Sequence, residues 1–185
     1  MFEKMKIIPL GILGLIFLLN IVSCNSDPEE PMISLYGAYL LTKIETDGQF
    51  DFLNVGEATS DMKKQLEESQ GVNFDNVLLT FFWGTPEVFN ITFMQPSLLT
   101  TLPDNIPLIR YVNSSKTLSV EYIQESREFS IIKNYTATTE IGQVTAIELV
   151  NQFQIKVSVP QRIYDYKSQA WVNTLVTYTY NRLNV

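Results

Sequence analysis

The 185-residue chain contains no histidine and only one cysteine, Cys24. Without histidine it lacks the side chain that most often serves as general base, zinc ligand or activator of a nucleophile. A single cysteine forms no internal disulfide and supplies no set of thiolates for a metal site. These absences exclude most metal-dependent and nucleophilic enzymes. An enzyme built on this chain would have to use carboxylates, serine with lysine, or tyrosine.

Basic residues are also scarce. The chain has 13 Lys and Arg residues against 20 Asp and Glu residues, and its formal net charge is −7. Proteins that bind nucleic acids neutralise phosphates with clustered Lys and Arg, and the sequence has no such cluster. We therefore expect no nucleic-acid partner.

The longest apolar run lies near the N-terminus. Lys4 and Lys6 precede an uncharged stretch, residues 7–22, that contains Pro9 and two glycines. A transmembrane helix needs about 20 apolar residues, so this run is too short. A charged start, a short apolar core and small residues before a cleavage point are typical of a secretory signal peptide. We predict that residues 1–23 are such a peptide and are removed.

Cys24 stands directly after this peptide, in the sequence Ile21-Val22-Ser23-Cys24. The four residues resemble the lipobox of bacterial lipoproteins. This resemblance implies that Cys24 becomes the first residue, carries a diacylglycerol on its thiol and is then acylated on its amino group. Two or more acyl chains anchor a protein stably, whereas one chain binds a membrane only marginally. The alternative is a secreted protein in which the cysteine is accidental.

Residues 24–34 begin with a polar, acidic segment that contains two prolines. Such a composition buries too little apolar surface to fold, so we predict a tether. The segment resembles the acidic export signal of Bacteroidetes lipoproteins, which implies a location on the outer face of the outer membrane. The alternative is a plain solvated spacer. Residues 35–185 remain as one domain of ordinary size.

Short β-rich runs dominate this domain. Apolar residues alternate with polar ones in several of them, as antiparallel strands packed on a core require. We predict antiparallel strands separated by turn residues, among them Asp104-Asn105 and Asn113-Ser114-Ser115. The expected fold is an all-β barrel of eight to nine strands with one short helix, and the alternative is a β-sandwich. The predicted strands are 34–45, 76–83, 87–94, 108–112, 117–123, 128–135, 146–150, 153–160 and 172–183.

The helix is expected just before Gly71, which would end it. Thr59 or Ser60 is the expected N-cap, and the narrow apolar stripe predicts a surface helix or a partial lid. Ser60 and Lys63 also match the Ser-x-x-Lys pattern of penicillin-recognising enzymes. Those enzymes need a Lys-Thr-Gly element, and residues 116–118 are Lys-Thr-Leu, so Ser60 is interpreted as a cap.

Both ends of the domain resemble lipocalin-like lipoproteins of the Bacteroidetes type. "LYGAYLLTKI", with Gly37 and Tyr39, resembles their opening strand, and "TLVTYTYNRL" resembles their last. "DFLNVGEATSDMKKQL" keeps Asp51, Asn54, Gly56 and the helix of their next segment but has Val55 where they have a second aspartate. The resemblance implies an up-and-down barrel whose mouth holds one small ligand.

Inward-facing aromatic residues would shape that mouth, and the candidates are Trp83, Phe93, Tyr122 and Trp171. The alternative is that these residues belong to the core, as most strand aromatics do. A different possibility is a surface platform for sugar rings, formed with Trp171 by the four tyrosines Tyr164, Tyr166, Tyr178 and Tyr180.

The carboxylates Glu121, Glu125 and Glu128 lie together in sequence, but nearby turn residues favour a solvated hairpin over a glycosidase pair. Residues 47–57 lack the ligand spacing of a calcium loop. We therefore expect a monomeric outer-membrane lipoprotein that binds a small apolar ligand without catalysis, metal or cofactor. The alternative is a surface module for glycan or protein with a filled barrel.

Overall fold

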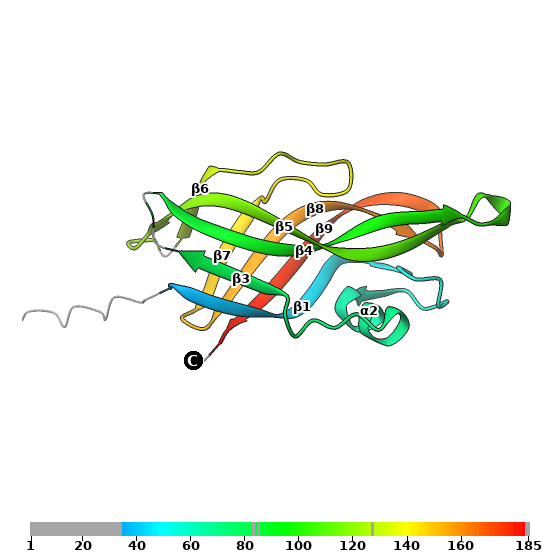
Figure 1. The fold of residues 1–185 in the computed structure, drawn as a ribbon, viewed down its shortest axis with the longest axis horizontal. Helices are drawn as coiled ribbons and strands as arrows, with labels where there is room; N and C mark the ends of the chain where they lie inside the picture. Colours follow the sequence, from blue (N-terminus) through cyan, green and yellow to red (C-terminus); the bar gives the residue numbers. More distant parts are fainter. Residues whose placement is uncertain (1–34, 83, 85, 127, 184–185) are drawn as a thin grey trace, which may run out of the picture. The chain divides into compact units, whose positions relative to one another are not determined.

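The protein is described by a computed structural model in which residues 35–82, 84, 86–126 and 128–183 are placed (Figure 1). The predicted signal peptide, Cys24, the tether and Trp83 lie outside the described residues. Within the described part, no helix has the length and hydropathy of a membrane span.

The described strands are all antiparallel and form a single sheet. Its order is β2-β1-β3-β4-β5-β6-β7-β8-β9, and β1 also pairs with β9, so the sheet closes into a ring with β2 beside β1. The all-β prediction with about nine strands and one short α-helix is confirmed, and the described strands do not divide into the two sheets of a sandwich. The strands are β1 (Gly37–Phe50), β2 (Thr59–Asp61), β3 (Leu78–Phe82), β4 (Glu87–Thr101), β5 (Pro107–Ile123), β6 (Glu128–Lys133), β7 (Ala146–Asn151), β8 (Gln154–Asp165) and β9 (Ala170–Arg182).

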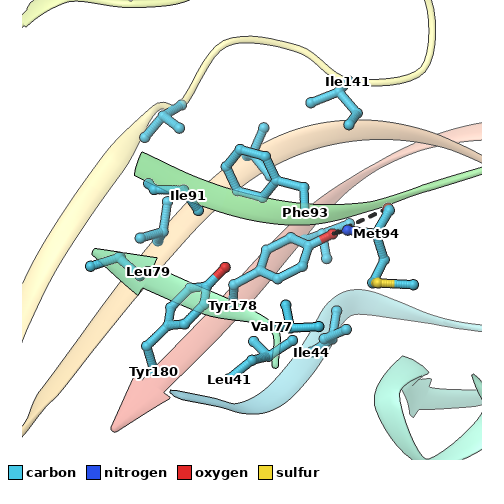
Figure 2. Packing of buried hydrophobic residues seen from close by; sticks show 14 of the residues in the cluster. Leu41, Ile44, Val77, Leu79, Ile91, Phe93, Met94, Ile141, Tyr178 and Tyr180 are labelled. Carbon is cyan, nitrogen blue, oxygen red and sulfur yellow. Dashed lines mark hydrogen bonds between the residues drawn. The ribbon is translucent and has the colours of Figure 1, made fainter. Parts of the chain in front are cut away.

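The interior of the ring is filled by its own side chains. Alternate residues of each strand point inward, as the period of two requires. Phe93 and Tyr178 meet in the middle with ring centroids 5.0 Å apart, and both side chains are fully buried. Figure 2 shows the rings of Tyr178 and Tyr180 among aliphatic residues of neighbouring strands. The largest fully buried side chains are Tyr39, Tyr178, Tyr180, Phe52, Phe89, Phe93, Ile44, Met62, Leu66, Leu79, Ile91 and Met94.

The ring is joined most sparsely between β6 and β7, where Glu128 pairs with Glu148. Residues 134–145 connect these two strands and pack against the core through Ile141 and Val144, which are both buried. The Tyr135 hydroxyl donates to the Gly142 carbonyl at 2.7 Å and braces this connection. The loop also pairs with β8, since the Gly142 N–H donates to the Pro160 carbonyl at 2.8 Å and the Arg162 N–H donates to the Glu140 carbonyl at 2.9 Å.

The β4–β5 hairpin is much longer than its neighbours. β3 pairs with β4 only as far as Ile91, and β6 pairs with β5 only from Ser119 onward. The outer half of the hairpin extends past both (Figure 1) and ends in the 3₁₀ turn η1 (Pro103–Asn105). The predicted turn at Asp104-Asn105 lies in this connection.

The turn predicted at Asn113-Ser114-Ser115 is wrong, because β5 runs straight through these residues. They pair with Met94, Phe93 and Thr92 of β4. The Thr92 and Ser115 hydroxyls also form a hydrogen bond, at 3.1 Å. A long partner strand supplies regular backbone pairs here, and that outweighs the turn preference of three small polar residues.

Where β4 extends beyond β3, its free backbone groups are hydrogen-bonded by side chains of β8 and β9 on the opposite side of the ring. The Tyr180 hydroxyl donates to the Thr92 carbonyl at 2.9 Å. The Tyr178 hydroxyl accepts from the Met94 N–H at 3.1 Å and also contacts the Met94 carbonyl (Figure 2). Gln161 donates to the Tyr178 hydroxyl at 2.9 Å. Because unpaired buried backbone groups are costly, these bonds tie the two walls together across the interior.

The backbone groups at the free edge of β5, in the same half of the hairpin, are also hydrogen-bonded by side chains. The Tyr166 hydroxyl accepts from the Ile109 N–H and donates to the Pro107 carbonyl, at 3.1 and 2.7 Å. The Gln70 amide donates to the Ile109 carbonyl and accepts from the Tyr111 N–H, at 3.0 and 3.2 Å. The side chains of Tyr166 and Gln70 thus take the place of a neighbouring strand.

The helix α2 (Met62–Gln70) begins and ends close to the predicted residues. Gly71 ends it in the left-handed conformation, with φ of 62°, as expected. The N-cap is Asp61, whose carboxylate accepts from the Lys64 N–H at 3.0 Å, and the prediction of Thr59 or Ser60 is wrong. Both of those residues are held in β2, and this pairing moves the start of the helix by one or two positions.

Removing single hydroxyl groups tests the contacts that cross the interior. Tyr178→Phe leaves the Met94 N–H and a Gln161 N–H buried without their acceptor, and we expect it to lower the free energy of unfolding by about 2–4 kcal/mol. Tyr180→Phe leaves only the Thr92 carbonyl without its donor, and we expect it to lower the free energy of unfolding by about 1 kcal/mol. Urea unfolding measures both variants. Equal or negligible losses would contradict the described hydrogen-bond pattern.

Candidate functional site

An open groove of about 590 Å³ lies where the C-terminal end of α2 meets the outer half of the β4–β5 hairpin. Figure 1 shows that these two elements occupy the same end of the ring, opposite the ends of β1 and β9 at which the described chain starts and stops. The groove is thus at the mouth of the fold but outside its filled interior. Its lining residues are Gln70, Gly71, Val72, Asn73, Met94, Leu99, Leu108, Ile109, Arg110, Tyr111, Val112 and Asn113.

One wall of the groove is the end of α2, and buried hydrogen bonds fix its position. The Gln65 amide accepts from the Phe52 N–H and donates to the Glu57 carbonyl, both at 2.8 Å. Gln65 is itself buried, and Met62 and Leu66 insert beside it into the core. Gln70 then bridges from the last turn of the helix to β5. The wall is therefore held on both sides and is not a free lid.

The loop that precedes α2 is organised around the carboxylate of Asp51. This side chain accepts from the N–H groups of Leu53, Val55 and Gly56 at 2.9 to 3.3 Å. Its own N–H donates to Asp165 at 2.9 Å, so the loop is attached to the β8–β9 turn.

Asp165 is the centre of that turn. Its carboxylate accepts from the Ser168 hydroxyl at 2.6 Å and from the N–H groups of Asp51, Lys167 and Ser168. Burial alone would raise the pKa of Asp165, but these hydrogen bonds outweigh burial and lower the pKa below its ordinary value of 3.8. The carboxylate is therefore ionised at neutral pH and holds the turn that carries Tyr166.

The chemistry of the groove is apolar with one cation. Val72, Leu108 and Val112 supply aliphatic surface, and Leu108 and Val112 are 39% and 40% exposed. Arg110 is the charged side chain of the lining and belongs to no ion pair of the described residues. The amides of Asn73 and Asn113 add neutral hydrogen-bonding groups.

Tyr111 lies beneath this surface, and its side chain is 97% buried, with 3% exposed. Its hydroxyl has no hydrogen-bond partner within the described residues, and neither has the Gln161 Oε1 atom. Burial, together with the nearby hydroxyls of Tyr178 and Tyr166, raises the pKa of Tyr111 far above the usual value. The group therefore remains a neutral donor at every physiological pH.

The aromatic residues expected to line one cavity do not come together. Phe93 is buried at the centre of the interior. Tyr122 packs on Phe129 near the β5–β6 turn, with centroids 5.0 Å apart. Trp171 lies near the β8–β9 turn at the other end of the strands, where the Arg162 guanidinium stands 4.9 Å from its ring. These three residues therefore lie at separate places in the fold, and Trp83 lies outside the described residues.

The tyrosine platform for sugar rings is wrong. Tyr178 and Tyr180 are fully buried, and Tyr164 and Tyr166 are 5% and 9% exposed. The hydroxyls of Tyr178, Tyr180 and Tyr166 bond the β4–β5 hairpin, and Tyr164 packs against Trp171 with ring centroids 5.6 Å apart. These four side chains therefore present little ring surface to solvent.

The groove residues gave little signal in the sequence. Val72 follows the helix stop, while Arg110 and Val112 alternate with buried residues and look like the solvent side of an ordinary strand. This face of β5 becomes a wall of the groove only because α2 lies beside the long β4–β5 hairpin.

No cluster of three or more His, Cys, Asp or Glu residues suited to a metal ion occurs among the described residues. Glu121, Glu125 and Glu128 are all exposed. In comparisons with known proteins, no family model, curated protein or solved structure matched this chain.

The carboxylate of Asp165 predicts a pH dependence. Because its folded-state pKa is lowered, its stabilising effect is present above the unfolded pKa of about 4 and is lost as pH falls through the folded pKa. Asp165→Asn should lower the free energy of unfolding by about 1–3 kcal/mol at pH 7. Urea unfolding between pH 7 and pH 2 should show the wild type and the variant converging on acidification. A constant difference across this range would contradict the assignment.

Proposed function

We propose that this protein binds a small amphiphile, without catalysis, in the groove between α2 and the β4–β5 hairpin. The observation that carries the proposal is the groove itself, because its volume of about 590 Å³ falls within the usual range of small-molecule sites. Its aliphatic walls and single guanidinium suit a ligand with an apolar body and an acceptor-bearing end.

The apolar walls supply the binding free energy in this proposal. Leu108 and Val112 are more than a third exposed, and covering such side chains releases roughly 25 cal/mol per Å² of apolar surface. The guanidinium of Arg110, which forms no ion pair with the described residues, then orients the ligand. An arginine can bind a carboxylate or phosphate through two parallel hydrogen bonds.

The filled interior argues against a ligand inside the ring. Phe93, Tyr178 and Tyr180 occupy the centre, and the two hydroxyls bond to the far wall. A ligand there would have to displace the core and leave the β4 edge unpaired. We therefore place the ligand in the groove at the mouth of the fold, outside the filled interior.

A second candidate is a surface module that acts through protein contacts. The filled interior favours it, as do the exposed apolar side chains of the hairpin, which include Leu98 and Leu99 at 56% exposure each. A glycan partner is less well supported, because the tyrosines that would stack on sugar rings are buried.

The lipoprotein assignment is part of the proposal. It is supported by the sequence of residues 21–24 and the preceding apolar run, which lie outside the described residues. The protein would be an outer-membrane lipoprotein at the cell surface, attached by lipid on Cys24 and separated from the bilayer by an acidic tether.

Cys24→Ala tests the lipid anchor. Without the thiol no acyl chain can be attached, so we expect the protein to move from the membrane fraction to the soluble fraction when cells are lysed and centrifuged. Ser26→Ala is a matched control in the same segment and should stay with membranes. Continued membrane fractionation of Cys24→Ala would contradict the lipobox assignment.

Native mass spectrometry tests the ligand proposal on residues 25–185 secreted from the original host. We expect a stoichiometric adduct on the order of a few hundred daltons, the size that a groove of this volume accommodates. Val112→Trp fills the groove with a residue that strands accept readily and should abolish the adduct.

Ile132→Trp is the matched control, because Ile132 is an exposed aliphatic residue of β6 (54% exposed) outside the groove lining. This variant should keep the adduct. An adduct retained by Val112→Trp, or absent from the wild type, would contradict binding in the groove.

A further inference from the structure

The tip of the β4–β5 hairpin carries four exposed leucines. Leu98, Leu99, Leu102 and Leu108 are 56%, 56%, 41% and 39% exposed. Figure 1 shows the connection between β4 and β5 projecting at one end of the described fold, past α2. Isolated exposed apolar residues are normal on protein surfaces, whereas a cluster of large ones at one projecting point marks an interaction site.

The leucines lie on both faces of the ribbon. Leu98 pairs with Ile109 and shares its face, and Leu108 is adjacent to Ile109 and so points to the opposite face. Leu102 lies in the connection at the end. A folded partner with a flat surface would cover one face of a ribbon. An environment that surrounds the tip would cover both.

The two strands of the tip remain paired with each other up to the turn. Thr100 pairs with Leu108, Thr101 pairs with Pro107, and the Leu102 N–H donates to the Ile106 carbonyl at 2.8 Å. Proline at positions 103 and 107 removes two further N–H groups. The pairing and the two prolines reduce the number of free N–H groups, which lowers the cost of placing the tip in the interfacial region.

The tip is nearly free of charge in a chain whose net charge is −7. Between Gln95 and Ile109 the sequence contains one ionisable residue, Asp104. The negative charge that would repel an anionic membrane surface lies mainly elsewhere. Asp104 limits how deeply the tip can enter hydrocarbon, because a carboxylate in the bilayer core is costly.

We propose that the tip of the β4–β5 hairpin inserts its leucines into the interfacial region of a lipid bilayer, at the boundary between headgroups and acyl chains. A second copy of the chain fits this surface less well, because a stable dimer buries roughly 800 Å² per partner over a continuous face. Four partly exposed leucines arranged around a ribbon end provide no such face. Leu99 and Leu108 also line the groove, whereas Leu98 and Leu102 do not, so variants of Leu98 and Leu102 test the tip separately from the groove.

Vesicle flotation tests the proposal with residues 25–185, which contain every pairing of the described sheet but lack the apolar N-terminal run. The probe is phosphatidylcholine vesicles, and the protein is expected to float with them in both low and high salt. Leu98→Ser with Leu102→Ser should lower the partition coefficient roughly tenfold or more, because two interfacial leucines lose their burial. Asp104→Asn should raise it, because the charge at the tip is removed.

Ile132→Ser with Phe153→Ser is the matched control, since these residues are 54% and 51% exposed on other elements. This control should partition like the wild type, and far-UV circular dichroism should show all variants folded. Absence of flotation in the wild type would overturn the proposal. So would equal loss in the control pair, or a concentration-dependent dimer in light scattering that Leu98→Ser with Leu102→Ser abolishes.

Discussion

The outer half of the β4–β5 hairpin has no neighbouring strand within the described residues, and its backbone groups need other partners. Tyr178 and Tyr180 reach across the interior to the β4 edge, while Tyr166 and Gln70 satisfy the β5 edge. Because buried unpaired N–H and C=O groups cost about 1–3 kcal/mol each, these side chains decide where the hairpin lies. They also occupy the space that a ligand inside the ring would need.

In the proposed function, ligand binding therefore takes place at the end of the fold and not in the interior. The same contacts that hold the hairpin across the mouth bring β5 beside α2 and create the groove with Arg110 on its lining. The tip beyond the groove is left with exposed leucines on both faces. An apolar tip next to an amphiphilic groove suits a protein that meets small amphiphiles at a membrane surface, and each part has its own test.

The sequence predicts much of the fold, because alternation of apolar residues is a local signal and β3, β8 and β9 follow it closely. Gly71 likewise ends the helix because only local backbone geometry is involved. The predictions were wrong where residues distant in the sequence determine the local structure. β5 continues through Asn113–Ser115 because β4 supplies a partner for each of these residues, and pairing in β2 shifts the N-cap to Asp61. The groove was not predictable, because Arg110 and Val112 alternate like residues on the solvent side of any strand.

The most direct test of the central claim is amide chemical-shift mapping of residues 25–185 titrated with dodecanoate, a simple anionic amphiphile. The account predicts saturable shifts at residues 70–73 and 108–113, with little change at Val157, Tyr178 and Tyr180 in the filled interior. Shifts concentrated on these interior residues would show that the ring opens to take the ligand inside. That result would contradict a function located at the outer end of the fold.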